Sequence, residues 1–343
     1  MKVNNQMNSK KIPLIEVHDI KQYFPIQEGL FKKNVGYIKA VNGVSLKVDS
    51  EETLGLVGES GCGKSTLGRS ILRLYEPTNG EVILYDNNRK INILELDKKE
   101  MKKVRAKLQM IFQDPFASLN ERMTVLQNVI EPLVCNEIGT KSENKSRAEE
   151  LLNKVGLRKE YLQRYPHSFS GGQRQRIGIA RALSIGPKFI VADEPVFALD
   201  VSVQAQILNL MKDLQEELSL SFLFISHDIG VVRYMADKIA VMYVGKLVEY
   251  ADRDELLKNP AHPYTEALQS AVPGRKRKRV DRIILKGNPP DPSNLPKGCI
   301  FQNRCRYEKD ICREEEPELK RISSGHYSAC HISNNLNLEG LIK

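Results

Sequence analysis

Short apolar runs alternate along the chain with segments of helical spacing. Runs of four to six apolar residues, typical of buried strands, lie at residues 54–57, 81–85, 108–112, 189–192 and 221–225. Apolar residues recurring every three or four positions predict helices at residues 67–74, 147–155, 177–183 and 203–218. Together these predictions indicate an α/β core, with residues 116–167 forming an inserted helical subdomain.

The first third of the chain carries a different pattern. Residues 15–23 and 40–48 alternate between apolar and polar side chains, as strands do, and residues 24–36 are expected to form a long loop between them. Phe24, or Tyr23 beside it, could stack on an adenine ring, and a role as a core aromatic is at least as compatible with the sequence.

A glycine-rich segment follows the strand at residues 54–57. Its residues match the phosphate-binding pattern G-x-x-x-x-G-K-[ST] at every fixed position: Gly58, Glu59, Ser60, Gly61, Cys62, Gly63, Lys64, Ser65 and Thr66. In such a strand-to-helix turn, backbone N–H groups surround an anion and the helix N-terminus adds positive potential. Lys64 is then expected to reach the β- and γ-phosphates of ATP, and Ser65 to bind Mg²⁺.

Three further segments carry polar residues at element ends. Ser170, Gly171, Gly172 and Gln173 open a predicted helix and offer a second anion site. Asp193 and Glu194 end the strand at residues 189–192, where Asp193 suits Mg²⁺ and Glu194 suits polarisation of an attacking water. His227 follows the strand at residues 221–225, at the sheet edge where α/β ligand sites lie.

Composition narrows the functional classes. The 343-residue chain has a net charge of +9, which suits an anionic membrane face without proving that location. Nucleic-acid binding is disfavoured by an aromatic content of 6% and the lack of Trp. The N-terminus is polar without an apolar signal core, and no apolar run approaches the ~18 residues of a membrane span.

Cysteines are distributed unevenly. Cys62 and Cys135 stand alone, whereas Cys299, Cys305, Cys312 and Cys330 are separated by five, six and seventeen residues near the C-terminus. An ATP-using protein is expected in the cytosol, where disulfides rarely persist. This spacing is unlike that of zinc ribbons, and it leaves an iron–sulfur cluster, structural zinc and no metal as alternatives.

The ordered motifs resemble those of the ATP-binding subunits of ABC transporters over residues 15–252. In this resemblance, residues 58–66 match Walker A, Gln113 the Q-loop, residues 170–173 the signature, Asp193 and Glu194 Walker B, Asp200 the D-loop, and His227 the switch histidine. Residues 112–120 and 259–265 and the terminal cysteines resemble the oligopeptide/dipeptide (and nickel) importer branch.

The resemblance implies a fold and a division of the chain. Residues 1–115 and 168–258 would form the P-loop NTPase core of the ABC ATPase type, with a mixed sheet in a RecA-like layer and an antiparallel β subdomain. Residues 116–167 would form the helical subdomain, and residues 259–343 a small cysteine-containing extension of the oligopeptide-transporter type.

The resemblance also implies the chemistry. Two ATPase subunits would sandwich two ATP molecules, each held by one P-loop and by the partner's signature segment. Catalysis would fall to Glu194, His227, Lys64 and Gln113, and Mg²⁺ would be bound by Ser65, Gln113 and Asp193. A [4Fe–4S] cluster would be held by the four terminal cysteines.

The implied machine imports oligopeptides or dipeptides. The partners would be two transmembrane permease subunits, a paralogous ATPase subunit and an extracellular peptide-binding protein, with this chain peripheral on the cytoplasmic side of the cell membrane. Two departures stand out: Phe197 replaces a small Ser or Thr beside the D-loop, and Ser168 stands where Glu is common.

Three alternatives accompany this interpretation. The same machine could import nickel, a metal chelate or another small solute, because the ATPase does not contact cargo. A soluble ABC-type ATPase of repair or translation is disfavoured, since there is no long insertion between Gln113 and Ser170 and only one P-loop. A degenerate regulatory subunit is disfavoured by the intact Lys64, Glu194 and His227.

Overall fold

A computed structural model of the chain describes residues 12–29, 33–272 and 282–342. The N-terminal stretch of residues 1–11, for which the sequence predicts no signal core, lies outside the described residues. The strands are β1 (Pro13–Glu28), β2 (Lys33–Asp49), β3 (Thr53–Val57), β4 (Asn79–Asp86), β5 (Arg89–Asn92), β6 (Leu108–Ile111), β7 (Phe189–Asp193), β8 (Ser221–Ser226), β9 (Lys238–Tyr243), β10 (Lys246–Asp252), β11 (Lys320–Ser323) and β12 (His326–Ser328).

Most helices are short. They are α1 (Lys64–Ile71), α2 (Lys98–Arg105), α3 (Pro115–Ser118), α4 (Val125–Cys135), α5 (Lys141–Lys154), α6 (Gly171–Leu183), α7 (Val201–Leu218), α8 (Ile229–Met235), α9 (Arg253–Lys258), α10 (Pro263–Ser270) and α11 (Ile311–Glu314), with 3₁₀ turns η1 (Lys159–Gln163), η2 (Pro166–Ser168), η3 (Gln302–Arg304) and η4 (Ser333–Asn335). In the part of the chain that the structure describes, none of these helices combines the length and hydropathy required to span a bilayer.

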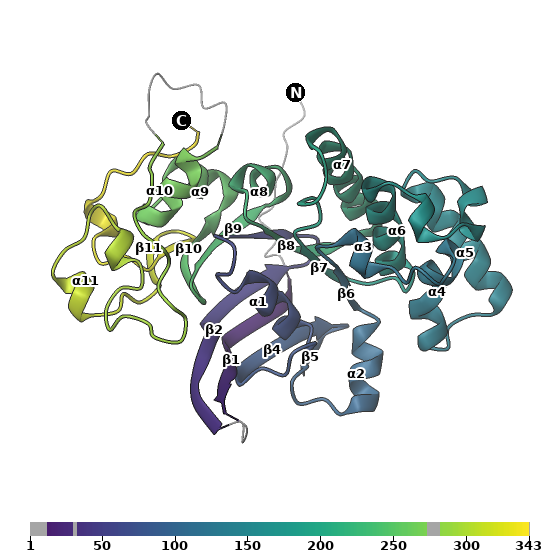
Figure 1. The fold of residues 1–343 in the computed structure, drawn as a ribbon, viewed down its shortest axis with the longest axis horizontal. Coiled ribbons are helices and arrows are strands. Elements are labelled where there is room, and N and C mark those ends of the chain that lie inside the picture. The colour runs from purple at the N-terminus through teal and green to yellow at the C-terminus, as the bar shows by residue number, and fades with distance from the viewer. Residues whose placement is uncertain (1–11, 30–32, 273–281, 343) are drawn as a thin grey trace.

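Two sheets form the centre of the molecule (Figure 1). The larger is mixed and has the order β11-β12-β10-β9-β3-β8-β7-β6, with parallel pairing from β9 through β6. The smaller is antiparallel, in the order β2-β1-β4-β5. This arrangement confirms the predicted mixed α/β core with an antiparallel β layer.

The central strands are buried because apolar layers cover both of their faces. Every residue of β3, β7 and β8 is buried. Along β7, Ile190 packs into one hydrophobic cluster, and Phe189 and Val191 pack into the other. Such double-sided burial produces the continuous apolar runs by which these strands are recognisable in the sequence.

Helices α3 to α6 gather at one side of the mixed sheet, on the right of Figure 1. Thr124 and Thr140 begin α4 and α5 with capping boxes. Each threonine side chain accepts from the backbone N–H three residues on, and the side chain of that residue accepts from the threonine N–H. Both helices pack on α6, which itself packs against β6. The limits of a separate helical subdomain at residues 116–167 stay a prediction.

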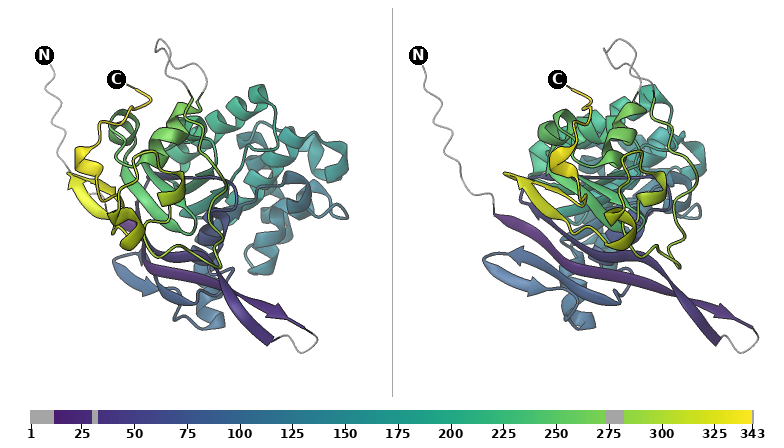
Figure 2. Two further views of the ribbon diagram at one scale, coloured as in Figure 1. Left: turned by 60° about the vertical axis from the view of Figure 1, so that its left-hand side comes forward. Right: turned by 90° about the vertical axis from the view of Figure 1, so that its left-hand side faces the viewer.

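The prediction of a long loop at residues 24–36 is wrong for most of that segment. β1 and β2 continue as an antiparallel hairpin with pairing as far as Glu28 and Lys33, and Figure 2 shows this hairpin projecting from the body. Val35 and Tyr37 are about half exposed there. Because few of these side chains reach the core, the outer hairpin lacks the apolar alternation from which strands are predicted.

The C-terminal segment joins the mixed sheet through a buried ion pair. β12 pairs with β10, and its His326 lies 2.8 Å from Glu249 Oε1, with exposures of 1% and 0% for the two side chains. Glu249 also accepts hydrogen bonds from the backbone N–H groups of Ala261 and His262. This carboxylate therefore connects β10, β12 and the start of α10.

The charge of this pair depends on pH. Burial alone disfavours the charged imidazole of His326, but the hydrogen bond and charge of Glu249, with Glu255 nearby, raise its pKa above the usual 6.5. Since the folded state then holds the proton more tightly than the unfolded chain, this stabilisation is complete below pH 6.5. It is lost as the pH rises through the higher folded-state pKa.

We expect His326→Gln to lower the free energy of unfolding by about 1–3 kcal/mol, because Glu249 loses a buried charged partner. The variant should also lose part of the pH dependence, so the difference from the parent chain should be larger near about pH 6 than near about pH 9. Thermal unfolding at both pH values measures this. His331→Gln, at a solvent-facing histidine of the same segment, is the control; equal effects of both substitutions would contradict the prediction.

Candidate functional site

The carboxyl ends of three neighbouring strands meet at one edge of the mixed sheet. Val57 of β3 pairs with Ser226 of β8, and Ile225 of β8 pairs with Asp193 of β7. The segments that leave these strands begin with Gly58, Glu194 and His227. Three motifs that are far apart in the sequence therefore lie side by side.

Two glycines of the P-loop lie where no side chain fits. A Cβ atom on Gly58 would come within 2.1 Å of the Met242 carbonyl oxygen, and one on Gly63 within 2.1 Å of the Ala40 carbonyl oxygen. Gly63 also has φ of +105°, which L-residues rarely adopt. The loop is thus pressed against β9 and β2, while Ser60 and Gly61 are exposed to solvent.

Lys64 is folded back over its own loop. Its Nζ donates to the carbonyl oxygens of Gly58 at 2.7 Å and Glu59 at 2.9 Å, and lies 3.9 Å from Glu194 Oε1. Buried Cys62 is next to it, with Sγ 3.9 Å from the same Nζ. The ammonium group is therefore held inside the loop by acceptors that a phosphate oxygen can replace.

Ser65 and Asp193 form the contact between the loop and β7. Ser65 Oγ donates to Asp193 Oδ1 at 2.6 Å, whereas Asp193 Oδ2 is buried without a hydrogen-bond partner. Burial raises the pKa of Asp193, against the opposing effect of the Ser65 hydrogen bond. A hydroxyl next to a buried carboxylate with one unpartnered oxygen fits Mg²⁺, which prefers oxygen ligands.

Glu194 is the point where the other site residues converge. Its Oε2 accepts from Gln113 Nε2 at 3.2 Å and lies 3.2 Å from His227 Nδ1. The residue has φ of +45°, a left-handed conformation that is rare outside glycine and costs energy. Its N–H donates to Ile225 O, so β8 holds this turn and directs the carboxylate toward Gln113 and His227.

Phe197 contacts His227, and the sequence does not predict this contact. Its ring packs edge-on against His227, with centroids 5.1 Å apart, and it remains 56% exposed. Both residues line a cavity of about 180 Å³ together with Glu194, Val196, Gln204, Ser226, Asp228 and Val231. The only signal in the sequence was an aromatic residue where the resembling family has a small one.

The signature residues lie on a different element from the P-loop. Ser170 caps α6, accepting from Gln173 N at 3.4 Å while Gln173 Oε1 accepts from Ser170 N at 3.1 Å. Gly172 packs closely on Val203 of α7. Among the described residues no hydrogen bond or ion pair joins residues 170–173 to residues 58–66, and Ser170 is exposed.

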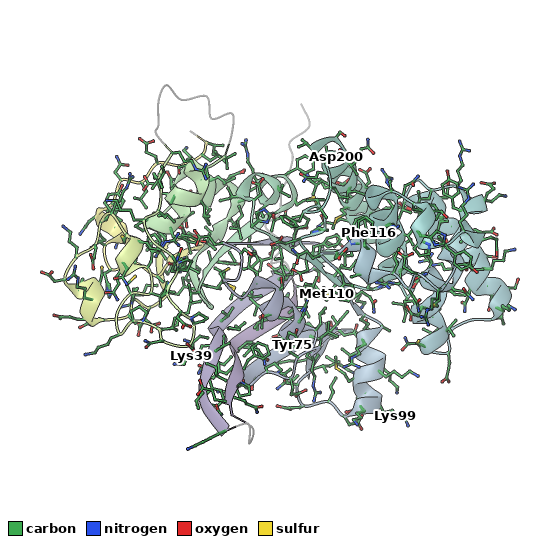
Figure 3. The ribbon with its side chains drawn as sticks, viewed as in Figure 1. Lys39, Tyr75, Lys99, Met110, Phe116 and Asp200 are labelled. Atoms are coloured by element: carbon green, nitrogen blue, oxygen red, sulfur yellow. The ribbon has the colours of Figure 1, made fainter. Side chains whose placement is uncertain are left out.

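Asp200 is the N-cap of α7. Its Oδ1 accepts from Val203 N at 3.0 Å and Ser202 Oγ at 2.7 Å, and the Ser202 hydrogen bond lowers the pKa of this carboxyl. In the view of Figure 3, Asp200 lies at the upper edge of the molecule, with Phe116 below it. Among the described residues, the hydrogen bonds of Asp200 are those of a helix cap.

The two candidate adenine-binding aromatics have other contacts. Tyr23 Oη donates to Asn42 Oδ1 at 2.6 Å, and half-buried Phe24 packs edge-on against Tyr75 at 5.6 Å. β1 runs beside α1, where Ser70 Oγ donates to Gln22 at 3.4 Å. Both aromatics thus lie on a strand that borders the P-loop helix.

A groove of about 690 Å³ lies beside Gln113, between α1, β6 and the helices around α4. Gln113 lines it, together with Arg69, Met110, Phe112, Asp114, Ala117, Ser118, Glu131, Pro132, Cys135 and Arg181. Arg181 of α6 donates to Ser118 O at 2.5 Å, and burial lowers the pKa of its guanidinium. One wall of the groove is therefore fixed to α6, the helix that Ser170 caps.

Two parts of the chain match known protein families. Residues 41–197 match the family model described as ABC transporter, and residues 248–312 match the model for the C-terminal region of oligopeptide/dipeptide transporters. The chain is 54% identical over 323 residues to the oligopeptide transport ATP-binding protein AppF of Bacillus subtilis, covering 93% of this chain and 97% of that protein.

The chain belongs to the ATP-binding subunits of oligopeptide/dipeptide ABC transporters. It is also 48% identical over 322 residues to the dipeptide transport ATP-binding protein DppF of Haemophilus influenzae, covering 93% of this chain and 97% of the relative. As an ABC ATPase, it is of the class that binds ATP with Mg²⁺.

Solved ABC cassettes share its fold. The dimeric structure of MJ0796, a bacterial ABC transporter cassette, is 32% identical and aligns with a TM-score of 0.60, covering 70% of this chain and 99% of that one. CbiO1 of Clostridium perfringens, part of the CbiONQ transporter complex, is 25% identical with a TM-score of 0.60, covering 72% of this ABC subunit and 91% of CbiO1.

The predicted iron–sulfur cluster at Cys299, Cys305, Cys312 and Cys330 is wrong. Within residues 12–29, 33–272 and 282–342, no group of three or more His, Cys, Asp or Glu side chains is arranged to hold a metal ion. Burial raises the pKa of Cys299 to about 12 and of Cys330 to about 11, and it also raises that of Cys305. Cys299 and Cys312 instead lie in the hydrophobic core, and Cys305 packs against it.

The same chemistry predicts how the cysteines of this ABC subunit react. We expect iodoacetamide at about pH 7.5 to label exposed Cys135 first, and to label buried Cys299 only after unfolding, because the reaction needs both access to the sulfur and the thiolate form. Peptide mass spectrometry of a time course measures this, with Cys135→Ser removing the fast phase. Fast labelling of Cys299 in the folded protein would contradict its burial.

Proposed function

We propose that this chain hydrolyses ATP to energise the import of oligopeptides or dipeptides by an ABC transporter. The observation that carries the proposal is the assembly of Lys64, Ser65, Asp193 and Glu194 around one point, with Gln113 and His227 on Glu194. Membership of the oligopeptide/dipeptide branch supports peptides as the cargo.

Each site residue has a chemical task in this proposal. Lys64 exchanges its two loop carbonyls for β- and γ-phosphate oxygens, and Ser65, Asp193 and Gln113 hold Mg²⁺. The ion, when bound, neutralises charge that develops on the phosphates. Glu194 orients the attacking water, and His227 contacts the γ-phosphate. The remaining P-loop groups, Gly58, Ser60, Gly61, Cys62, Gly63 and Thr66, surround the phosphates through their backbone N–H groups.

The second half of the site comes from a partner ATPase subunit. The exposed N-terminus of the 13-residue α6, with Ser170, Gly171, Gly172 and Gln173, would face the γ-phosphate bound by the partner. Exposed Asp200 and Phe197 would lie at the same interface. A related cassette, MJ0796, is described as dimeric and bound to ADP and Pi in a post-hydrolysis state, which supports a paired arrangement.

The adenine is proposed to lie beside β1, on Phe24. This aromatic is half-buried on the strand that borders α1. Its contact with Tyr75 is edge-on, with centroids 5.6 Å apart, and stacking on an adenine would use a face of the Phe24 ring.

The remaining partners follow from the groove. Its mixed apolar and charged lining beside Gln113 suits a helix from one of two permease subunits, which would keep the chain peripheral on the cytoplasmic side of the cell membrane. A paralogous ATPase subunit and an extracellular peptide-binding protein complete the proposed importer. The division into residues 1–115 with 168–258, 116–167 and 259–343 belongs to this proposal.

Glu194→Gln tests the catalytic assignment. The amide keeps the contacts of Glu194 but cannot polarise water, so hydrolysis should fall roughly 10²–10⁴-fold while ATP binding persists. ATPase turnover and ATP affinity measured together separate the two effects. Glu150→Gln on α5, which is exposed and distant in sequence from all site residues, is the control. Normal turnover of Glu194→Gln would remove this residue from its role.

Crosslinking tests the groove. In a Cys135→Ser background, which removes the native thiol of the groove, a cysteine replacing Ser118 should crosslink to a permease subunit in the assembled complex. Ser202→Cys, exposed at the start of α7, is the matched control and should not crosslink to the permease. Equal yields at both positions, or none at Ser118, would contradict the placement of the permease helix.

A further inference from the structure

The C-terminal extension contacts the P-loop directly through Arg304. The guanidinium Nη1 donates to Glu59 Oε2 at 2.7 Å and Nη2 donates to Glu59 Oε1 at 3.0 Å, forming a two-pronged ion pair. The Arg304 side chain is 7% exposed. Its partner Glu59 is 29% exposed, so the pair is partly buried, and its two parallel charge-assisted hydrogen bonds fix orientation as well as distance. Residues 245 positions apart are thus held in one geometry.

Tyr264 of α10 holds the backbone of the same residue. Its Oη accepts from Glu59 N at 2.7 Å, and the side chain is fully buried. In a phosphate-binding loop the orientation of each peptide group decides whether its N–H or its carbonyl faces the anion. Tyr264 fixes this orientation at the first peptide after Gly58.

A cluster of aromatic rings supports both contacts. Tyr243 of β9, Tyr264 and Phe301 pack against one another, with ring centroids 4.7 to 5.5 Å apart. Arg304 also donates to Tyr243 Oη at 3.3 Å and lies over that ring. The support for Glu59 is therefore rigid, since it consists of packed rings from the sheet, α10 and the segment at η3.

The carboxylate, the N–H and the carbonyl of Glu59 all have hydrogen-bond partners. Arg304 holds the carboxylate and Tyr264 the N–H, while the carbonyl accepts from Lys64 Nζ at 2.9 Å. The same carbonyl also accepts from Cys62 N at 3.3 Å, a bond that persists when Lys64 moves to a phosphate. The carboxylate and the N–H of Glu59 then remain fixed by the two contacts from the extension.

We propose that Arg304 and Tyr264 are positioning residues for nucleotide binding, through which the C-terminal extension preorganises the P-loop. The inference rests on the proposed function, in which ATP binds at residues 58–66. Arg304 has a second effect, because it neutralises a carboxylate one residue from the start of a loop that must accept a polyanion. Without Arg304, the unpaired and partly buried carboxylate of Glu59 would repel the incoming phosphates at short range.

We expect Arg304→Ala to weaken ATP binding roughly 10- to 100-fold, the range for losing a buried charge-assisted pair. The loss should appear in KM, with kcat changing less, since Glu194, Gln113 and His227 are untouched. Adding Glu59→Gln removes the unpaired charge, so the double variant should bind ATP more tightly than Arg304→Ala alone. Tyr264→Phe, which keeps the packing and removes the hydroxyl, should also raise KM.

Arg306→Ala is the matched control. Arg306 lies two residues away, pairs with buried Glu266 at 2.9 Å and lies over the ring of Tyr307, but none of these residues contacts the P-loop. Its substitution should leave ATP affinity unchanged. Circular dichroism checks folding, and if Arg304→Ala does not fold, Arg304→Lys replaces it. Lysine keeps the positive charge but cannot form the two-pronged ion pair with Glu59, so the KM of this variant for ATP should rise several-fold.

The outcomes separate this inference from the function on which it rests. Parental protein that neither binds nor hydrolyses ATP would overturn the proposed function itself. Parental protein that binds ATP, with unchanged affinity in both Arg304 variants, would overturn only the role of Arg304. Independent, additive losses from Arg304→Ala and Glu59→Gln would likewise overturn the pairing, because coupled residues give non-additive effects.

Discussion

The common ending of β3, β8 and β7 at one sheet edge is the constraint on which the rest of the structure depends. Val57 pairs with Ser226 and Ile225 pairs with Asp193, both in parallel register. The residues that follow these three strands therefore lie next to one another along the sheet edge. A shift of one residue in β7 would turn Asp193 to the opposite face and separate it from Ser65. Buried strands that are apolar on both faces fix that register, and they thereby fix the positions of the site residues.

Much of this edge could be predicted from the sequence, since each motif is local and follows a recognisable strand. Asp193, Glu194 and His227 were expected at strand ends, and the structure brings them to the P-loop. The start of α1 was less predictable: it begins at Lys64, three residues before Leu67, the first apolar position of the predicted helix. Lys64, Ser65 and Thr66 carry no apolar signal because their groups serve the site.

The features that the sequence did not predict depend on contacts between distant segments or on backbone conformation. The φ of +45° at Glu194 has no local sequence signal, because the bond from its N–H to Ile225 sustains it. The pairing of Glu59 with Arg304 joins two ordinary surface-type residues that only the tertiary fold brings together. The cysteine spacing predicts metal ligation, whereas tertiary packing places Cys299 and Cys312 in the hydrophobic core.

Asp193 shows that this site is built for an occupant at some cost to the empty protein. A fully buried carboxylate with one unpartnered oxygen and a raised pKa is unfavourable by itself. Arg69, 3.9 Å from that oxygen, and the single Ser65 hydrogen bond compensate only in part. A divalent cation at Oδ2 would favour the charged carboxylate and supply the missing partner. The same burial that destabilises the unliganded edge would therefore strengthen its interaction with Mg²⁺ and phosphates at the proposed site, because low polarity increases every charge interaction there.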